Sequence, residues 1–174
     1  MTIWPCQAWW VTVRPVRAVR EGAGVRITAR ADYAVRAMVE LTVAEGTLSA
    51  EEIVTRQGIP RAFLLSILAE LRRAGLVASV RGASGGHRLA CQPGEVTVAM
   101  VVRAVEGPLA RVSDSRPEEI SYPGPAESLR LVWVALRASM REVLEHVTIA
   151  DLASGSLPES VLSRTRDPDV WCSR

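Results

Sequence analysis

The chain of 174 residues is long enough for one domain of ordinary size, or for a small domain with an added arm. Its composition, 48% hydrophobic and 23% charged, excludes the low-hydrophobicity, high-charge class of sequence that stays disordered. All 21 basic residues are arginine and the net charge is only +2, so the placement of the charges says more about partners than their sum.

Residues 1–24 read as a separate N-terminal piece. They hold three of the five tryptophans and show no helical period. Their arginines follow the apolar part, whereas a signal peptide places its positive charges first, so secretion is not expected. We expect an extension that is either not native or disordered, with native translation starting at Val25.

The helical pattern starts after this piece. Apolar residues recur at helical spacing between Arg30 and Ala44, and Gly46 supplies a stop. Ser49 and Glu52 form a capping box, which predicts a short second helix ending at Gly58.

A third helix is predicted from Pro60, which suits a first helical position, to Gly75. We interpret its apolar stripe as core; it consists of Phe63, Leu64, Ile67, Leu68 and Leu71. Only the segment 57–59 separates the two short helices, which is the tight glycine turn of a helix-turn-helix.

Two strands, Leu76–Val80 and Arg88–Cys91, are predicted on either side of the glycine-rich loop Arg81–Gly86. The loop lacks the lysine and serine or threonine that end a phosphate-binding loop, so it is not a nucleotide site. The helix-turn-helix and the hairpin together predict a winged helix covering residues 25–107.

A further helix is predicted from its Thr97 cap through Val105, followed by a polar connection over residues 108–126. Residues 127–152 are then expected to hold a long dimerisation helix, Glu127–Val147, and its end. Its apolar seam comprises Leu129, Val132, Trp133, Leu136, Met140, Val143, Leu144 and Val147. Residues 153–174 are predicted to be a flexible tail. The fold class is therefore mainly α with a small β-hairpin wing: a winged helix-turn-helix plus a long C-terminal dimerisation helix.

The charges are distributed unevenly between the winged-helix part of the chain and the part that follows it. Residues 56–88 carry six arginines against one acid, a net +5, while residues 108–174 carry eight arginines against ten acids, a net −2. The positive part coincides with the third helix and the wing, where DNA phosphates would be met.

The segments VRITARADYAVRAMVEL from Val25 and IPRAFLLSILAELRRAGLVASVRGASGGHRLACQPGEVTVAMVVRAVEG from Ile59 resemble the Rrf-type (IscR/NsrR-like) winged-helix transcriptional regulators. The resemblance runs from about Val25 to Leu152. It implies a cytoplasmic homodimer that binds an inverted-repeat operator in double-stranded DNA.

By the same resemblance, Arg61, Ala62 and Ser66 face the major groove and Arg81 enters the minor groove. The candidate DNA-binding set is completed by Ser49, Gly82, Ser84, Gly85, Gly86 and His87. For Arg72 and Arg73, phosphate contact and a solvated helix face are left as equal alternatives.

One departure from the family pattern concerns iron. Members that hold an iron-sulfur cluster place three cysteines in the connection, but residues 108–128 contain none. Asp32 matches a carboxylate ligand of one cluster-holding branch, yet a carboxylate without thiolates cannot retain such a cluster. We therefore expect no cofactor and no metal site. A second departure, Met100 in place of a capping acid, should affect structure only.

The three cysteines, Cys6, Cys91 and Cys172, are too widely spaced for a zinc site or a disulfide framework and predict reduced thiols in a cytoplasm. His87 and Cys91 stand four apart on a strand, but two ligands without a third are more often coincidence. His146 is interpreted as a partner of a helix dipole, and Trp133 as packing, with an effector pocket as the alternative.

No catalytic constellation is visible, so no enzyme is expected. No stretch approaches the roughly 20 continuous apolar residues of a membrane helix, so no membrane span is expected either. The leading hypothesis is a sequence-specific DNA-binding transcriptional regulator, and we expect it to act as a repressor. The alternatives are a winged-helix module that binds protein, and a regulator that senses a small molecule or metal. The sequence leaves the effector and the operator unknown.

Overall fold

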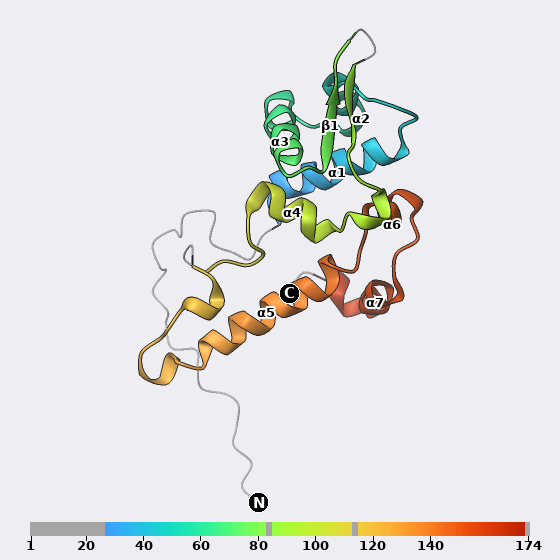
Figure 1. The fold of residues 1–174 in the computed structure, drawn as a ribbon. Coiled ribbons are helices and arrows are strands. Elements are labelled where there is room, and N and C mark those ends of the chain that lie inside the picture. The colour runs from blue at the N-terminus through green and yellow to red at the C-terminus, as the bar shows by residue number, and fades with distance from the viewer. Residues whose placement is uncertain (1–26, 83–84, 113–114, 173–174) are drawn as a thin grey trace, which may run out of the picture.

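The computed structural model describes residues 27–82, 85–112 and 115–172 (Figure 1). The predictions made for residues 1–24 and for Ser84 lie outside these ranges. In chain order the helices are α1 (Ala29–Val43), α2 (Ala50–Gln57), α3 (Arg61–Arg73), α4 (Val98–Glu106), α5 (Leu129–Leu144), α6 (Ile149–Ser154) and α7 (Glu159–Leu162). The strands β1 (Val77–Val80) and β2 (Gly86–Leu89) lie between α3 and α4. Within the described ranges no helix combines the length and the apolar character needed to cross a bilayer.

Helix starts follow the caps that the sequence predicts. The Ser49 hydroxyl accepts a hydrogen bond from the Glu52 amide while the Glu52 carboxylate accepts one from the Ser49 amide, which is the full capping box. Thr97 caps α4 by accepting from the amide of Met100 at 3.2 Å. The Met100 side chain thus leaves this cap intact.

The wing is an antiparallel pair in which Val77 lies opposite Leu89 and Val80 opposite Gly86. β1 ends at Val80 as predicted but starts one residue later, and β2 spans Gly86–Leu89 where Arg88–Cys91 was predicted. The base of the wing has a further backbone partner. Leu48 donates to the His87 carbonyl at 2.9 Å and accepts from the His87 amide at 2.7 Å, so the segment before α2 acts as a short third strand.

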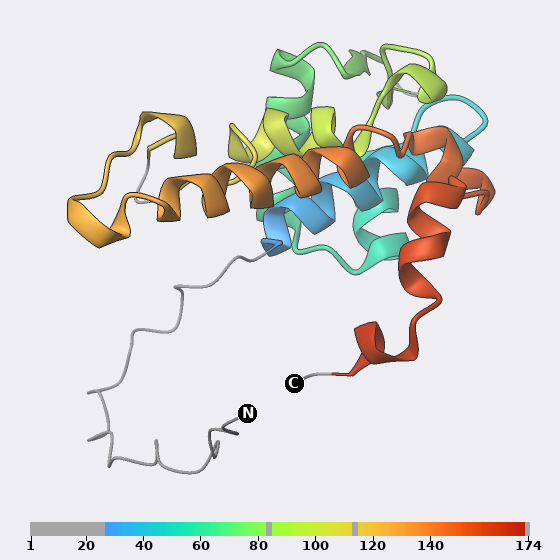
Figure 2. The same cartoon turned by 90° about the horizontal axis from the view of Figure 1, so that it is seen from below.

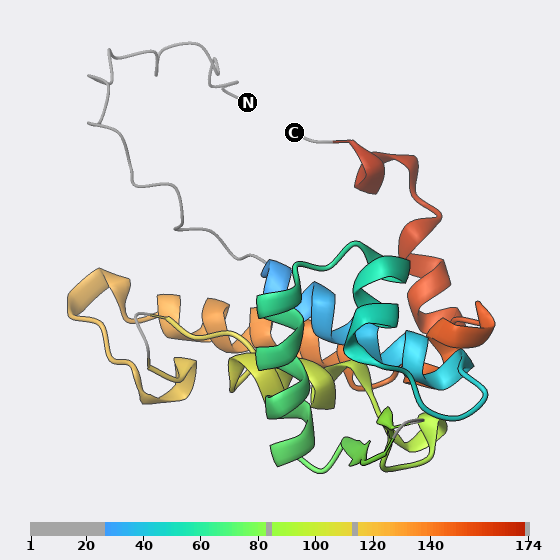
Figure 3. The same cartoon turned by 90° about the horizontal axis from the view of Figure 1, so that it is seen from above.

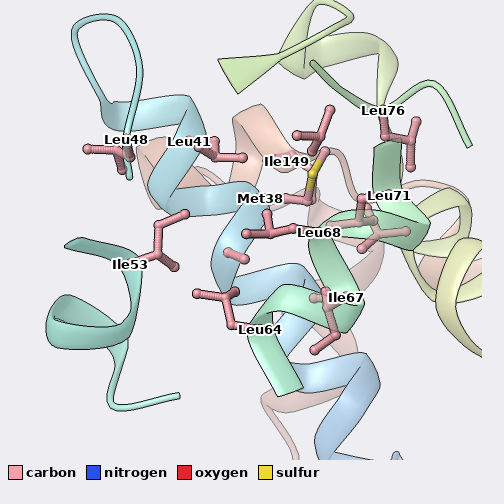
Figure 4. Close-up of a cluster of buried hydrophobic side chains, with 14 of the residues drawn as sticks. Met38, Leu41, Leu48, Ile53, Leu64, Ile67, Leu68, Leu71, Leu76 and Ile149 are labelled. Carbon is pink, nitrogen blue, oxygen red and sulfur yellow. The ribbon is translucent and has the colours of Figure 1, made fainter. Parts of the chain in front are cut away.

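The core lies where α3 crosses α1 (Figure 4). Leu64, Ile67, Leu68 and Leu71 on α3 are buried against the Met38 face of α1. The prediction that Phe63 belongs to this stripe is wrong, because the residue is 51% exposed; its ring forms a T-shaped pair with the Tyr33 ring, with centroids 6.4 Å apart. Phe63 precedes Leu64 by one residue and therefore projects about 100° around the helix from it, at the edge of the contact with α1 and outside the buried core.

A segment far along the chain completes this core. Ile149 at the start of α6 is fully buried in the same cluster, and α6 packs on α1. The amide of Val98 donates to the Val147 carbonyl at 2.9 Å, which fixes the entry to α6 beside the start of α4. The structural unit that holds the wing thus includes α6, whereas the sequence places the boundary of the winged helix at residue 107.

Helix α5 runs along one side of the molecule, with α3 and the wing on the opposite side (Figures 1 and 2). None of its 16 residues is buried in the protomer. The helix ends at Leu144, so the prediction that it reaches Val147 is wrong. Val147 is 5% exposed and packs inside the protomer, and it does not belong to the seam of α5.

The C-terminal residues also differ from the expected tail. α7 and two 3₁₀ turns, Ser163–Thr165 and Pro168–Trp171, follow α6 (Figure 3). Arg164 pairs with Glu142 of α5 at 2.8 Å. Composition suggested a tail because serine, glycine and proline dominate there, but these residues serve here as caps and turns.

Replacing Ile67 by alanine should lower the free energy of unfolding by about 2–5 kcal/mol, because the fully buried side chain leaves a cavity between α3 and α1. Leu65→Ala, on the exposed side of the same helix, is the matched control and should cost much less. Urea unfolding followed by circular dichroism measures both. Equal losses in the two variants would contradict the orientation of α3.

Candidate nucleic-acid interface

Helix α3 presents a continuous exposed face. Gly58 ends α2 with φ +62° and its amide donates to the Val54 carbonyl at 2.8 Å, so the chain turns sharply and α3 begins three residues later. Burial of the Leu64 stripe then turns the opposite face outward. Five exposed residues occupy its first two turns: Arg61, Ala62, Phe63, Leu65 and Ser66.

The predicted major-groove residues Arg61, Ala62 and Ser66 all lie on this face. The Arg61 guanidinium contacts the Glu51 carboxylate, but both side chains are more than 60% exposed, so the pair contributes little and can be exchanged for a phosphate. The Ser66 hydroxyl accepts from Arg30 at 3.1 Å, which fixes its orientation.

Ser49 forms the capping box that the sequence predicts, and its DNA contact stays a prediction. Its amide and hydroxyl both hydrogen-bond to Glu52, and these bonds hold the pKa of the Glu52 carboxyl below its ordinary value, the backbone bond contributing most. Because the hydroxyl is engaged in the cap, the main contribution of Ser49 is to position α2.

Arg81 and Gly82 are exposed at the end of the wing, beyond β1. Gly82 has φ +120°, a conformation that other residues rarely adopt. A Cβ atom on Gly85 would lie 2.5 Å from the Val80 carbonyl oxygen, so the two strands approach too closely for a side chain here. The wing glycines thus shape a narrow hairpin that carries Arg81.

His87 lies at the base of the wing and is half-buried. Burial lowers the pKa of its imidazole, and the positive charge of Arg72 lowers it further, so the ring is mostly neutral near pH 7. Its Nδ1 lies 3.4 Å from the Ser79 hydroxyl. His87 therefore adds no positive charge for DNA, whereas its backbone joins the wing to Leu48.

Comparison with known proteins identifies this arrangement. The Rrf2 family profile, described as an iron-dependent transcriptional regulator, matches residues 27–155. A protein of Mycobacterium tuberculosis (strain H37Rv) named as an HTH-type transcriptional regulator is 48% identical over 145 residues, covering 82% of this chain and 90% of that protein. This chain belongs to the Rrf2 family.

Solved Rrf2-family structures share the fold. CymR of Bacillus subtilis, titled the global cysteine regulator of that organism, is 31% identical, covers 75% of this chain and 97% of its own, and superposes with a TM-score of 0.59. IscR of T. potens is 29% identical, covers 86% and 98%, and gives a TM-score of 0.63. The expected family and the expected fold class of winged helix-turn-helix are thereby confirmed.

The described residues of this Rrf2 protein do not assemble an iron site. In the described part of the chain no three histidine, cysteine or carboxylate side chains gather as metal ligands do. Asp32 pairs with Arg36 at 3.2 Å, and the connection over residues 108–128 has neither cysteine nor histidine. Cys91 lies behind the wing, where its thiol donates to the Gly75 carbonyl, and Cys172 is an exposed free thiol after the last 3₁₀ turn. Cys6 lies outside the described residues.

Two residues of the exposed α3 face, Phe63 and Leu65, were not among the predicted site residues. Large apolar side chains on a helix are assigned to the core by default, and only their angular position relative to Leu64 and Ile67 reveals that they point outward. A narrower apolar stripe, drawn through Leu64, Ile67, Leu68 and Leu71 alone, is the signal that separates them.

Replacing Gly86 by alanine should destabilise the protein by about 1–3 kcal/mol, because the new Cβ would lie 2.5 Å from the Leu48 carbonyl oxygen. Gly94→Ala is the matched control, since its Cβ would have no neighbour within 4 Å. Urea unfolding should separate the two variants. A stable Gly86→Ala protein would show that the wing is not held against Leu48.

Proposed function

We propose that this Rrf2-family protein is a cytoplasmic homodimer that binds an inverted-repeat operator in double-stranded DNA and regulates transcription, as a repressor, without an iron-sulfur cluster. The observation that supports this proposal is that the proposed DNA-binding surface and the proposed dimer surface lie on opposite sides of the protomer. α3 and the wing lie on one side of the protomer, and α5, none of whose residues is fully buried, lies on the other (Figure 1).

The α3 face is suited to a major groove in shape and chemistry. A helix fits the groove, and its N-terminal residues reach the base edges. Arg61 supplies a guanidinium for phosphate or guanine, and Ser66 a hydroxyl. Phe63 and Leu65 add apolar surface, which recognises the methyl group of thymine. We therefore include these two residues in the DNA-reading set.

Helix α5 provides the surface for the second protomer. Leu131 and Val132 are 65% and 55% exposed on it, and a 16-residue amphipathic helix without a single buried residue needs a partner. A second copy lets α5 pair with itself about a twofold axis. The two α3 helices can then meet half-sites about one helical turn, roughly 34–36 Å, apart.

The iron-free part of the proposal is supported by the ligand chemistry. An iron-sulfur cluster needs several thiolates at one site. The two described cysteines lie in different parts of the fold, and the connection supplies no thiolate. Protein purified without oxygen should therefore be colourless and should bind DNA without added iron.

Arg81→Ala should weaken operator binding by about 1–3 kcal/mol, the range of a good base-reading contact, because the arginine at the wing tip is placed for the minor groove. The operator is first obtained by sequencing genomic fragments bound by the purified protein. Arg166→Ala removes the same charge from the C-terminal segment and should leave affinity unchanged. A mobility shift at constant salt measures both, and equal affinities for wild type and Arg81→Ala would remove the wing from the interface.

The double variant Leu131→Asp, Val132→Asp should raise the dimer dissociation constant at least about 100-fold, because burying unpaired carboxylates is strongly unfavourable. Leu162→Asp, on an exposed leucine of α7, is the control. Sedimentation at micromolar concentration should find monomers of the double variant that keep the helical circular dichroism spectrum. A tight dimer in that variant would place the seam elsewhere.

A further inference from the structure

A cavity of about 330 Å³ opens at the junction between the winged helix and α5. Its polar lining consists of Arg103, Arg116, Arg137, Arg141 and Glu118, arranged around the Pro108–Leu109 segment. The lining comes from three parts of the chain: α4, the connection and α5. α4 and the 3₁₀ turn Pro117–Glu119 of the connection both pack on α5, which runs beneath α4 in Figure 1.

The carboxylates around this cavity do not saturate its guanidinium groups. Glu118 contacts Arg137, and one oxygen of Glu145 accepts from both Arg103 and Arg141. Glu119 lies 4.0 Å from Arg116 and also accepts from the Arg116 amide. Four guanidinium groups carry about twenty N–H donors, whereas these three carboxylates offer about twelve acceptor positions. Among the residues that the structure describes here, one positive charge and several donors are therefore not matched by a carboxylate.

The arginines of the cavity also affect the pKa values of the nearby carboxyls. The pKa of Glu145 is lowered by its bonds from Arg103 and then from Arg141. The pKa of Glu118 is lowered first by a bond from its own backbone amide and then by Arg137 and Arg116. Both carboxyls thus remain ionised in mildly acidic solution and keep their bonds to the arginines.

We propose that this cavity binds a small multivalent oxyanion, a polycarboxylate or phosphate-bearing metabolite, as the effector of the protein. Guanidinium groups match carboxylate and phosphate oxygens with paired, charge-assisted hydrogen bonds. The volume lies in the range of small-molecule sites, and the buried Leu109 offers an apolar contact for a carbon skeleton.

The position of the cavity gives binding a consequence for DNA recognition, which rests on the proposed function. Arg103 belongs to α4, whose Ala99 and Val101 are buried with the winged helix. Arg137 and Arg141 belong to the proposed dimer helix. An anion held by all three arginines replaces their bonds to Glu118 and Glu145, and so changes how the winged helix is fixed to α5. In a dimer, that change alters the spacing of the two α3 helices and couples anion binding to operator affinity.

Isothermal titration of the full chain with citrate, inorganic phosphate and sulfate, at ionic strength held constant with sodium chloride, tests the site. We expect saturable binding of at least one of these anions, one per protomer, and the comparison of citrate with phosphate separates the carboxylate source from the phosphate source. Arg141→Gln should weaken this binding about 10-fold or more, the effect of losing a hydrogen bond to a charged group. Arg130→Gln, an exposed arginine of α5 outside the cavity lining, should leave it unchanged.

Glu118→Gln should change the affinity for the anion in the opposite direction. Removing the carboxylate that competes for Arg137 should tighten anion binding, a gain that unfolding cannot imitate. Absence of saturable binding for all three anions, or equal losses in Arg141→Gln and Arg130→Gln, would overturn the site.

The saturating anion should also shift operator affinity at least about 5-fold, the lower end of typical allosteric coupling. An unchanged operator affinity would overturn its effector role. Failure of the anion-free protein to bind DNA would instead count against the proposed function and leave the titration result standing.

Discussion

The apolar stripe of α3 packs against α1 through a surface of small side chains, and this contact determines which residues of α3 face outward, on the surface proposed to meet DNA. Ala34 and Ala37 are fully buried on α1 beside Met38, so the backbone of α3 can approach closely while Leu64, Ile67 and Leu68 fill the space between. The helix cannot rotate without exposing a leucine or burying Arg61. Side-chain packing on the inner face therefore fixes the outer face.

The sequence is most informative where one residue determines local structure. Ser49 with Glu52, Gly58 and Thr97 set helix ends that the structure confirms, because caps act within one turn of backbone. It is least informative where distant segments meet. Leu48 pairs with His87 across 39 positions, and Ile149 fills a core formed by α1 and α3. Neither contact has a local signal. The assignment of Val147 to the seam failed for the same reason, since its burial depends on the bond between its carbonyl and Val98.

The candidate sites also differ in whether neighbouring or distant segments of the chain form them. Most predicted DNA-binding residues belong to two adjacent elements, α3 and the wing, and the sequence locates them because a short turn keeps those elements together. The arginine cavity was not predicted, because its residues are separated by up to 38 positions and converge only through the path of the connection. The charge sum of −2 over residues 108–174 even suggests an acidic region. Glu145 and Glu119 pair with arginines of the cavity without lining it, so a sum over the segment does not show that four arginines gather at one place.

The backbone bridge between Leu48 and His87 makes the wing and the helix-turn-helix one mechanical unit. A free two-stranded hairpin is only marginally stable, and ordering it on DNA would consume part of the binding free energy as lost conformational entropy. Here the second strand is held at its base by two hydrogen bonds to the segment that leads into α2. The base of the wing is therefore held in place without DNA, so the entropic cost of ordering it need not be met when the proposed Arg81 contact forms.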